Sequence, residues 1–186
     1  MPVVPAMPAM IEIRPAARPD LESLVALVRS ELECQEQFSQ TFKLASDVDW
    51  WDYVAAKLRP GSSQLLVAQS AQGLVGYIEF RVAGQSGGRS GNRLKRLLKL
   101  ILNRGSLPPV VPVQPRQYGY IEDVFVLPDL RSQGVASRLI QSALAWFAER
   151  DIHQVEAAVW SPNRASLGLF EKLGFRQVRI LVGRSV

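Results

Sequence analysis

Cysteine and histidine are almost absent from this 186-residue chain, which has one of each, Cys34 and His153. A single thiol excludes an internal disulfide and fits the reducing cytoplasm, where we expect the protein to be located. Cys34 has no neighbours typical of a reactive thiol, so we interpret it as an ordinary helical side chain. His153 immediately precedes a predicted strand and is not among our catalytic candidates.

Long apolar runs are also missing. The first 14 residues are apolar but interrupted by three prolines and lack a basic start. They therefore match neither a signal peptide nor a membrane-spanning helix, and we treat residues 1–10 as an N-terminal tail. Apolar residues make up 47% and charged residues 21% of the chain. This ordinary composition excludes wholesale disorder, and the length suits one domain, residues 11–186.

Acidic residues are absent between Gly84 and Gln117, a segment that holds seven of the 22 Lys and Arg residues. A Gly/Ser-rich stretch, 84–92, and a proline-rich stretch, 107–116, flank a basic and apolar helix candidate, 93–103. We interpret 84–117 as an insertion in the domain. Weak contact of residues 89–104 with an anionic surface is one hypothesis, and a loop without a ligand is another. We expect no specific nucleic-acid recognition.

The remaining sequence alternates between strand and helix patterns. Helical spacing begins at Leu21, and a second helix is predicted from Ser46 to just before Pro60. Further helices are predicted after Pro128, through Phe147, and over 163–173. Strands are predicted over residues 11–14, 64–69, 74–82, 118–126, 154–160 and 176–182. These elements predict a single α/β (α+β) domain with a mixed, twisted central sheet flanked by helices.

Residues 124–137 combine a strand, a tight turn and a helix start at Gly134. The unpaired N–H groups of a first helical turn form an anion site, and a glycine lets phosphate oxygens approach the backbone. Ser132 and Ser137 would add hydroxyl donors, and Arg131 a cation. Taken alone, a strand, turn and helix with one glycine is more often only a turn.

Residues 131–136, Arg-Ser-Gln-Gly-Val-Ala, resemble the pyrophosphate-binding motif of the GNAT N-acetyltransferase superfamily. Residues 11–21 are similar to the opening strand and helix of that family. Residues 163–175 are similar to its second cofactor-side motif, including the closing Gly-Phe. The resemblance covers most of the chain except 84–117. It implies an acetyl-CoA-dependent N-acetyltransferase that acts on a small amine or a protein amine. No metal ion is expected. An oligomer is possible, since similar proteins are often dimers.

The resemblance also implies roles for individual residues. The backbone of Val124, Phe125 and Val126 would pair with the pantetheine arm of acetyl-CoA like an added strand. Asn163 would contact the cofactor, and it is equally suited to cap a helix. The pyrophosphate would be held by a run that follows Arg131, namely Ser132, Gln133, Gly134, Val135, Ala136 and Ser137.

Glu122 and Asp123 are the candidates for the base that removes a proton from the amine. They are consecutive carboxylates in an apolar strand, where a regular backbone would point them to opposite faces. Residues 121–124 are similar to polyamine and related small-amine acetyltransferases, in which the glutamate position lies near the acceptor. We therefore prefer Glu122, acting through water. The alternative is a solvated or ion-paired carboxylate.

Phe170 departs from the resemblance, because many family members have a tyrosine there as general acid, and phenylalanine has no hydroxyl to donate. This favours an alternative function, a catalytically weak acyl-CoA-binding module with a regulatory or partner-binding role. Acidic and aromatic side chains between the first two predicted helices would suit a pocket for a cationic acceptor. Solvent-exposed helix faces and core packing explain these side chains equally well. These residues are Glu31, Glu33, Glu36, Trp50, Trp51 and Tyr53.

Overall fold

A computed structural model describes residues 11–39, 42–61, 63–84 and 117–182. The tail over 1–10 and the basic segment over 89–104 lie outside these residues. The expectations for them therefore stay predictions.

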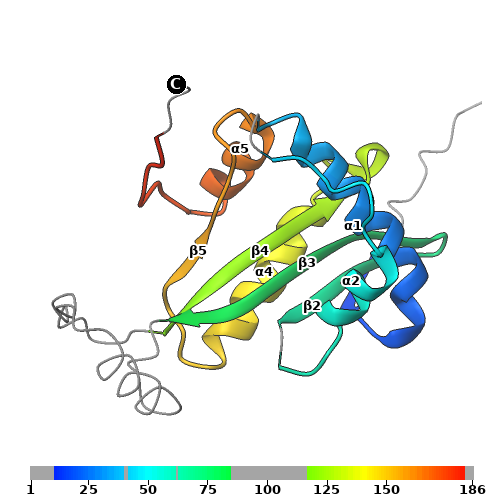
Figure 1. Ribbon diagram of the computed structural model, residues 1–186. Helices are drawn as coiled ribbons and strands as arrows, with labels where there is room; N and C mark the ends of the chain where they lie inside the picture. Colours follow the sequence, from blue (N-terminus) through cyan, green and yellow to red (C-terminus); the bar gives the residue numbers. More distant parts are fainter. Residues whose placement is uncertain (1–10, 40–41, 62, 85–116, 183–186) are drawn as a thin grey trace, which may run out of the picture.

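The described chain forms one five-stranded sheet in the order β1-β2-β3-β4-β5 (Figure 1). Its strands are β1 (Glu12–Pro15), β2 (Gln64–Ser70), β3 (Gly73–Gly84), β4 (Gln117–Val126) and β5 (Val155–Ala157). The first four strands pair antiparallel in chain order, and β5 pairs parallel to β4. The expected mixed sheet is confirmed.

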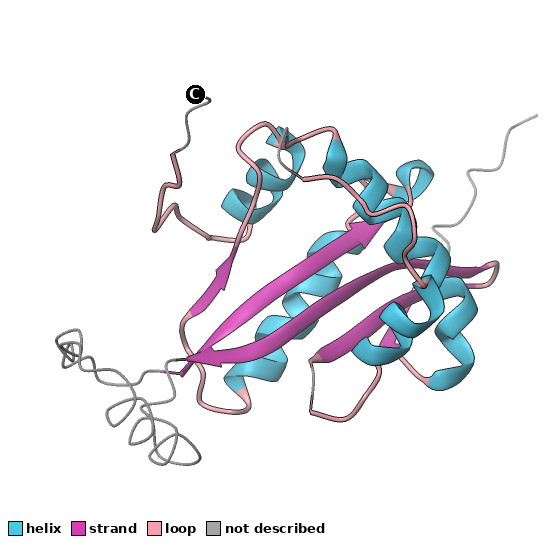
Figure 2. Cartoon of the chain, in the orientation of Figure 1, coloured by secondary structure: helices cyan, strands magenta, loops and turns pink. Residues whose placement is uncertain are grey.

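Helices cover both faces of the sheet (Figure 2). The pair α1 (Leu21–Glu36) and α2 (Trp50–Lys57) lies on one face, and α4 (Val135–Ala148) lies on the other. The last helix, α5 (Arg164–Lys172), follows β5, and short 3-10 turns over Arg18–Asp20 and Pro128–Leu130 precede α1 and α4. No described helix is long and apolar enough to cross a membrane.

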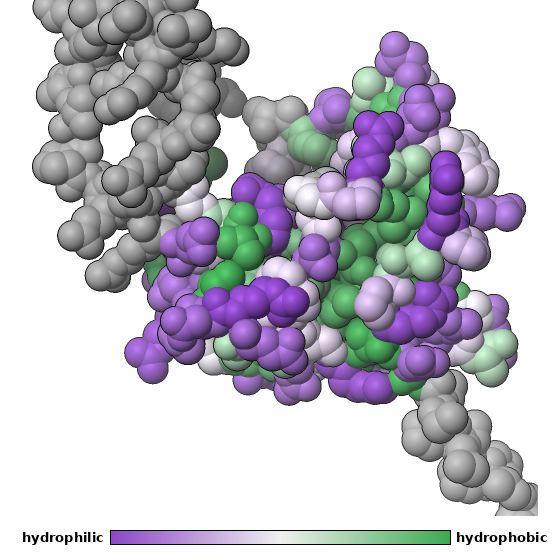
Figure 3. All heavy atoms as spheres, turned by 90° about the horizontal axis from the view of Figure 1, so that it is seen from below, coloured by the Kyte–Doolittle hydropathy of each residue, from purple (hydrophilic) through white to green (hydrophobic). Residues whose placement is uncertain are grey.

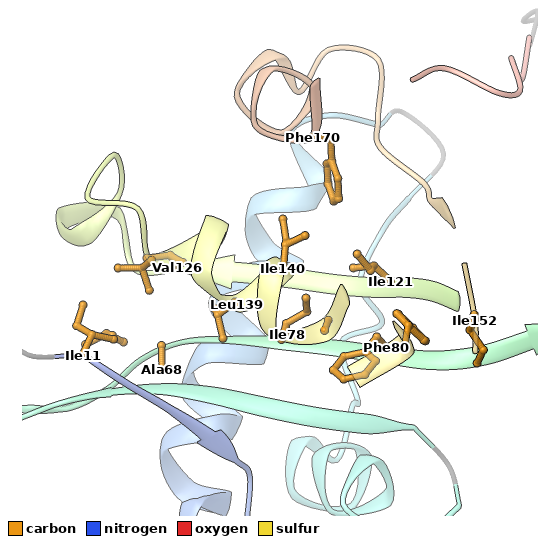
Figure 4. Close-up of a cluster of buried hydrophobic side chains, with 14 residues drawn as sticks. Ile11, Ala68, Ile78, Phe80, Ile121, Val126, Leu139, Ile140, Ile152 and Phe170 are labelled. Carbon is orange, nitrogen blue, oxygen red and sulfur yellow. The ribbon is translucent and has the colours of Figure 1, made fainter. Parts of the chain in front are cut away.

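Two hydrophobic cores lie on the two sides of the sheet. Because side chains alternate along a strand, β3 serves both: Tyr77 joins the core under α1, while Ile78 and Phe80 join the core under α4. Phe80 and Phe147 meet edge to face at 5.2 Å in the α4 core, part of which Figure 4 shows. On the face seen in Figure 3, apolar side chains form patches that are bordered by hydrophilic side chains.

Two predicted boundaries and one predicted strand are wrong. The second helix begins at Trp50 rather than Ser46, because Asp49 caps it by accepting a hydrogen bond from the Asp52 N–H at 3.0 Å. The strand predicted over 154–160 ends at Ala157, and residues 176–182 form no strand. The apolar side chains of the latter segment are exposed, as for Ile180 at 69%. Strand propensity was not sufficient there, because a strand also needs a neighbouring backbone to pair with.

Gly84 and Gln117, the described residues on either side of 85–116, pair directly with each other in the β3–β4 ladder. A two-residue Asn-Gly turn in place of residues 85–116 would therefore connect two strands already in register. We expect this shortened chain to fold, with a melting temperature within a few degrees of the full chain by circular dichroism. Loss of cooperative melting would contradict this.

The same two chains test the hypothesis that residues 89–104 contact an anionic surface. The full chain should bind anionic vesicles at low salt, and the shortened chain should not.

Candidate active site

A β-bulge interrupts β4 at Glu122. Glu79 of β3 opposes Asp123, whereas the next β3 residue, Phe80, opposes Ile121, so β4 carries one extra residue. A bulge resets the alternation of side chains along a strand. Ile121 accordingly packs in the α4 core, while Asp123 contacts Lys57 of α2 on the opposite side of the sheet. The assumption of a regular strand at this position is wrong.

The pairing between strands β4 and β5 ends next to this bulge. Pairing between them covers only Gly119, Tyr120 and Ile121 of β4, and Figure 1 shows β5 leaning away from β4 beyond it. Among the described residues, β4 has no strand partner on this side over 122–126. An open strand edge of this kind offers main-chain donors and acceptors to an extended ligand.

The turn between β4 and α4 presents unpaired backbone donors. The first backbone hydrogen bond of α4 runs from the Arg138 N–H to the Gly134 carbonyl at 3.0 Å. In the described structure, the N–H groups of residues 132–137 have no protein acceptor. Gly134 caps the helix at φ 81°, a left-handed conformation that favours glycine. Free N–H groups at the positive end of a helix dipole form an anion site.

Two other predicted cofactor-binding residues, Arg131 and Asn163, form hydrogen bonds within the protein. The Arg131 side chain donates from Nε to the Val126 carbonyl at 3.0 Å, and its guanidinium lies 5.6 Å from the Phe125 ring centre. Arg131 thus fastens the turn to the end of β4. Asn163 caps α5, because its Oδ1 accepts from the Ser166 N–H at 3.1 Å. Cofactor contacts of these two side chains remain predictions.

A charged cluster lies between α2 and the sheet. Lys57 is hydrogen-bonded to Glu79 and its Nζ is 3.4 Å from Asp123 Oδ2. The Ser63 hydroxyl donates to Glu79 Oε1 at 2.6 Å. The side chains of Lys57, Glu79 and Asp123 are only 13%, 8% and 18% exposed. Sequence analysis missed Lys57 and Glu79, although a glutamate within the apolar run 74–80 was a detectable signal.

Glu31 of α1 joins this cluster from above the sheet. It is 6% exposed, its Oε2 accepts from the Tyr77 hydroxyl at 3.0 Å, and its Oε1 accepts from the Gln35 side-chain amide. Burial raises the pKa of Glu31 from its ordinary 4.5 to about 7, and the Asp123 charge adds to this; Gln35, Tyr77 and Lys57 oppose it. The Glu31 side chain therefore titrates near neutral pH.

The other groups of the cluster are also perturbed. Burial raises the pKa of Asp123, Lys57 opposes the rise, and Glu79 adds to it. Burial alone would lower the pKa of Lys57, but its bonds and charges with Glu79 and Asp123 raise it overall. Lys57 thus stays an ammonium at neutral pH. Among the described residues, Glu79 and Asp123 contact this cation and Glu31 lies within reach of its charge, so the negative charge of the cluster would favour a second cation.

Several sequence candidates lie outside the cluster. Glu122 is ion-paired with Arg81 and its side chain is 32% exposed. Glu33 pairs with Arg29, and Glu36 accepts from the Leu44 N–H. Trp51 and Tyr53 are 52% and 42% exposed on α2.

Phe170 is 7% exposed in the α4 core, where its ring packs at 5.0 Å on Phe175. Figure 4 shows it directed from α5 toward Ile140. Phe170 therefore has no hydroxyl to donate, and its side chain packs in the hydrophobic core.

Comparison with known proteins decides the family. A sequence model of the Acetyltransferase (GNAT) family matches residues 24–175, which span most of the chain. The chain belongs to the GNAT acetyltransferase family. The open β4 edge and the donor-rich turn lie within the matched region.

Individual GNAT relatives are distant. The uncharacterized N-acetyltransferase MJ1207 of Methanocaldococcus jannaschii is 28% identical over 71 residues, 38% of this chain and 31% of the length of that relative. The tetramutant of the BH1408 protein of Bacillus halodurans matches with a TM-score of 0.72 and 16% identity, covering 94% and 99% of the two chains. The aminoglycoside N-acetyltransferase AAC(6')-Iy in complex with CoA matches with a TM-score of 0.61 and 18% identity, covering 98% and 99%. The two solved structures support the fold.

Proposed function

We propose that this protein is an acetyl-CoA-dependent N-acetyltransferase that acts on a cationic amine. One juxtaposition carries the proposal: the open edge of β4 over 122–126 runs directly into the turn with the unpaired N–H groups of residues 132–137. A ligand with an extended amide-containing arm and a pyrophosphate would satisfy both. CoA has that chemistry, and a GNAT relative of known structure holds CoA.

The residues fit such a ligand along its length. The backbone of residues 124–126 would pair with the pantetheine amides, and the N–H groups of residues 132–137 would bind the pyrophosphate oxygens. Arg131 would keep the turn in position through its bond to the Val126 carbonyl. Bound acetyl-CoA would supply a thioester whose carbonyl carbon forms a bond to the amine nitrogen as the C–S electron pair leaves on sulfur.

The acidic cluster supports a cationic acceptor. Asp123 lies one residue beyond the bulge at which β4 and β5 separate, and its carboxylate shares Lys57 with Glu79. An acceptor ammonium there would supply the second positive charge that three carboxylates favour. Glu122 already has Arg81 as its partner. The arrangement therefore favours Asp123 over Glu122 as the carboxylate that binds the amine, whereas our sequence-based preference was for Glu122 as the base.

Phe170 bears on the fate of the leaving group. Its position in the α4 core supplies no hydroxyl to protonate the CoA sulfur. A thiol has an ordinary pKa of about 8.5, so the thiolate is a modest base that water can protonate after it leaves. The alternative of a weak acyl-CoA-binding module remains supported by this same residue.

One experiment separates these two functions. Acetyl-CoA binding is measured by calorimetry, and thiol release is followed with a panel of primary amines that includes polyamines, aminoglycosides and peptide N-termini. The enzyme should bind acetyl-CoA and release thiol above the hydrolysis rate with at least one cationic amine. Binding without amine-dependent release would instead support the binding module.

Asp123→Asn should lower kcat/KM for the amine by about 10²-fold at pH 8, because the acceptor ammonium would lose the buried carboxylate that binds it. Asparagine keeps the shape but removes the charge that faces Lys57. The affinity for acetyl-CoA should change less than twofold. Glu122→Gln is the matched comparison, since it neutralises the neighbouring carboxylate. A larger loss in Glu122→Gln than in Asp123→Asn would return the role to Glu122.

A further inference from the structure

Glu31 is a buried carboxylate without a cation of its own. None of the ion pairs in the described part of the chain involves Glu31, although only 6% of the residue is exposed. A buried charge without a partner is costly, and folded proteins rarely keep one without a reason. The nearby cation, Lys57, is already engaged by Glu79 and Asp123.

The hydrogen bonds around Glu31 set its oxygens as acceptors. The Tyr77 hydroxyl donates to Oε2 and the Gln35 amide nitrogen donates to Oε1. The orientation of Gln35 is fixed in turn, because its oxygen accepts from the Trp160 indole N–H at 3.5 Å. Donors on both oxygens favour the carboxylate form and aim the remaining lone pairs at a further donor.

The same contacts connect Glu31 to the segment that follows β5. Trp160 follows β5, is 37% exposed and bonds to Gln35 of α1. Glu31 thus bonds Tyr77 of β3, which pairs with Phe125 of β4, and it feels the charge of Asp123 two residues before Phe125. Gln35 and Trp160 therefore orient Glu31 but form no proton relay, because amide and indole N–H groups are donors that do not pass on a proton at neutral pH.

We propose that Glu31 accepts the proton that the acceptor ammonium must lose before it attacks the thioester, while Asp123 holds the ammonium. In this step an N–H bond of the ammonium breaks, its electron pair stays on nitrogen, and an O–H bond forms on the Glu31 carboxylate. The proton is afterwards released to water. The inference rests on the proposed function and names a catalytic residue on α1 in place of one on β4.

A pH dependence follows from the groups that face Glu31. These are Tyr77 on β3, Asp123 on β4, Lys57 on α2 and Gln35 on α1 itself, and Lys57 is in turn bonded to Glu79 of β3. With the pKa of Glu31 at about 7, the carboxylate that accepts the proton forms as the pH rises through neutrality. The rate should therefore rise and then level off well below the pKa of the amine.

The test is the pH profile of kcat/KM, from pH 5 to 10, with an amine that the wild-type enzyme acetylates. The wild-type profile should break near pH 7. Glu31→Gln should be about 10²-fold slower at pH 8 and should rise without that break toward the pKa of the amine. Glu22→Gln, an exposed glutamate on the same helix, should keep the wild-type profile.

Two further variants protect the test against a folding defect. Glu31→Asp keeps a carboxylate and should retain a break with a lower kcat. Tyr77→Phe removes one donor to the carboxylate and should move the break to higher pH. A break near pH 7 that survives in Glu31→Gln, with a rate within threefold of wild type, would overturn the inference while the proposed function stands. Acetyl-CoA binding without turnover of any amine by the wild-type protein would overturn both.

Discussion

Gly134→Glu should reduce acetyl-CoA affinity by more than about 10²-fold. A Cβ at position 134 meets no atom within 4 Å, so a new side chain has open space, and position 134 itself lies within the run of unpaired N–H groups over 132–137. A carboxylate there would face the pyrophosphate at short range. Two like charges 4 Å apart near a protein surface repel by about 4 kcal/mol, which corresponds to roughly a thousandfold in affinity. Calorimetry with acetyl-CoA measures the loss directly.

Gly61→Glu is the control for this prediction. Gly61 also has positive φ, 83° against 81° for Gly134, and equally open surroundings. It follows α2 and is far along the chain from the turn. Both substitutions therefore impose similar backbone strain, about 1 kcal/mol, but only one places charge beside the anion site. Equal affinities in the two folded variants would contradict the assignment of the pyrophosphate to this turn.

Glu31→Gln should make the protein more stable than wild type at alkaline pH. The pKa of Glu31 is about 7 in the folded chain against an ordinary 4.5. A folded-state pKa above the unfolded value contributes stability that is complete below pH 4.5 and is lost as the pH rises through 7. The loss is about 1.4 kcal/mol per pKa unit, or about 3 kcal/mol in all. Glutamine stays neutral and avoids it.

Urea unfolding of wild type and Glu31→Gln at pH 4.5 and pH 8.5 checks this sign. The difference in unfolding free energy between the two proteins should shift by about 3 kcal/mol in favour of the variant between these pH values. Asp123 is present in both proteins, but its charge raises the pKa of Glu31, so part of the measured shift reflects this pairwise repulsion. Glu22→Gln should show no such shift. A difference that is independent of pH would mean that Glu31 titrates normally in the folded protein.

Glu31→Gln is expected to change stability and catalytic rate in opposite directions. The variant gains stability above neutral pH and loses catalysis, as is common for groups kept for function at a cost to the fold. A residue needed only for packing would lose stability at every pH and leave the break in the rate profile unchanged. Together, the two measurements distinguish a functional from a structural carboxylate.

Local sequence determined most of the framework. The periodic patterns of α1 and α4 and the apolar runs of β2, β3 and β4 predicted these elements to within a few residues. Gly134 at a helix start and Asn163 as a cap were also readable from the chain. These features depend on residues within one or two turns of each other, where hydrogen bonding and side-chain spacing are set by neighbours in sequence.

Only the tertiary structure decided which carboxylates meet. Lys57, Glu79 and Asp123 come from α2, β3 and β4, and Glu31 meets Tyr77 across 46 positions of sequence. The bulge at Glu122 overturned the alternation on which the comparison of Glu122 with Asp123 depended. Residues 176–182 have a strand pattern but no strand. In each case the outcome depended on a backbone or side chain brought near by folding, and neither periodicity nor composition records which distant segments become neighbours.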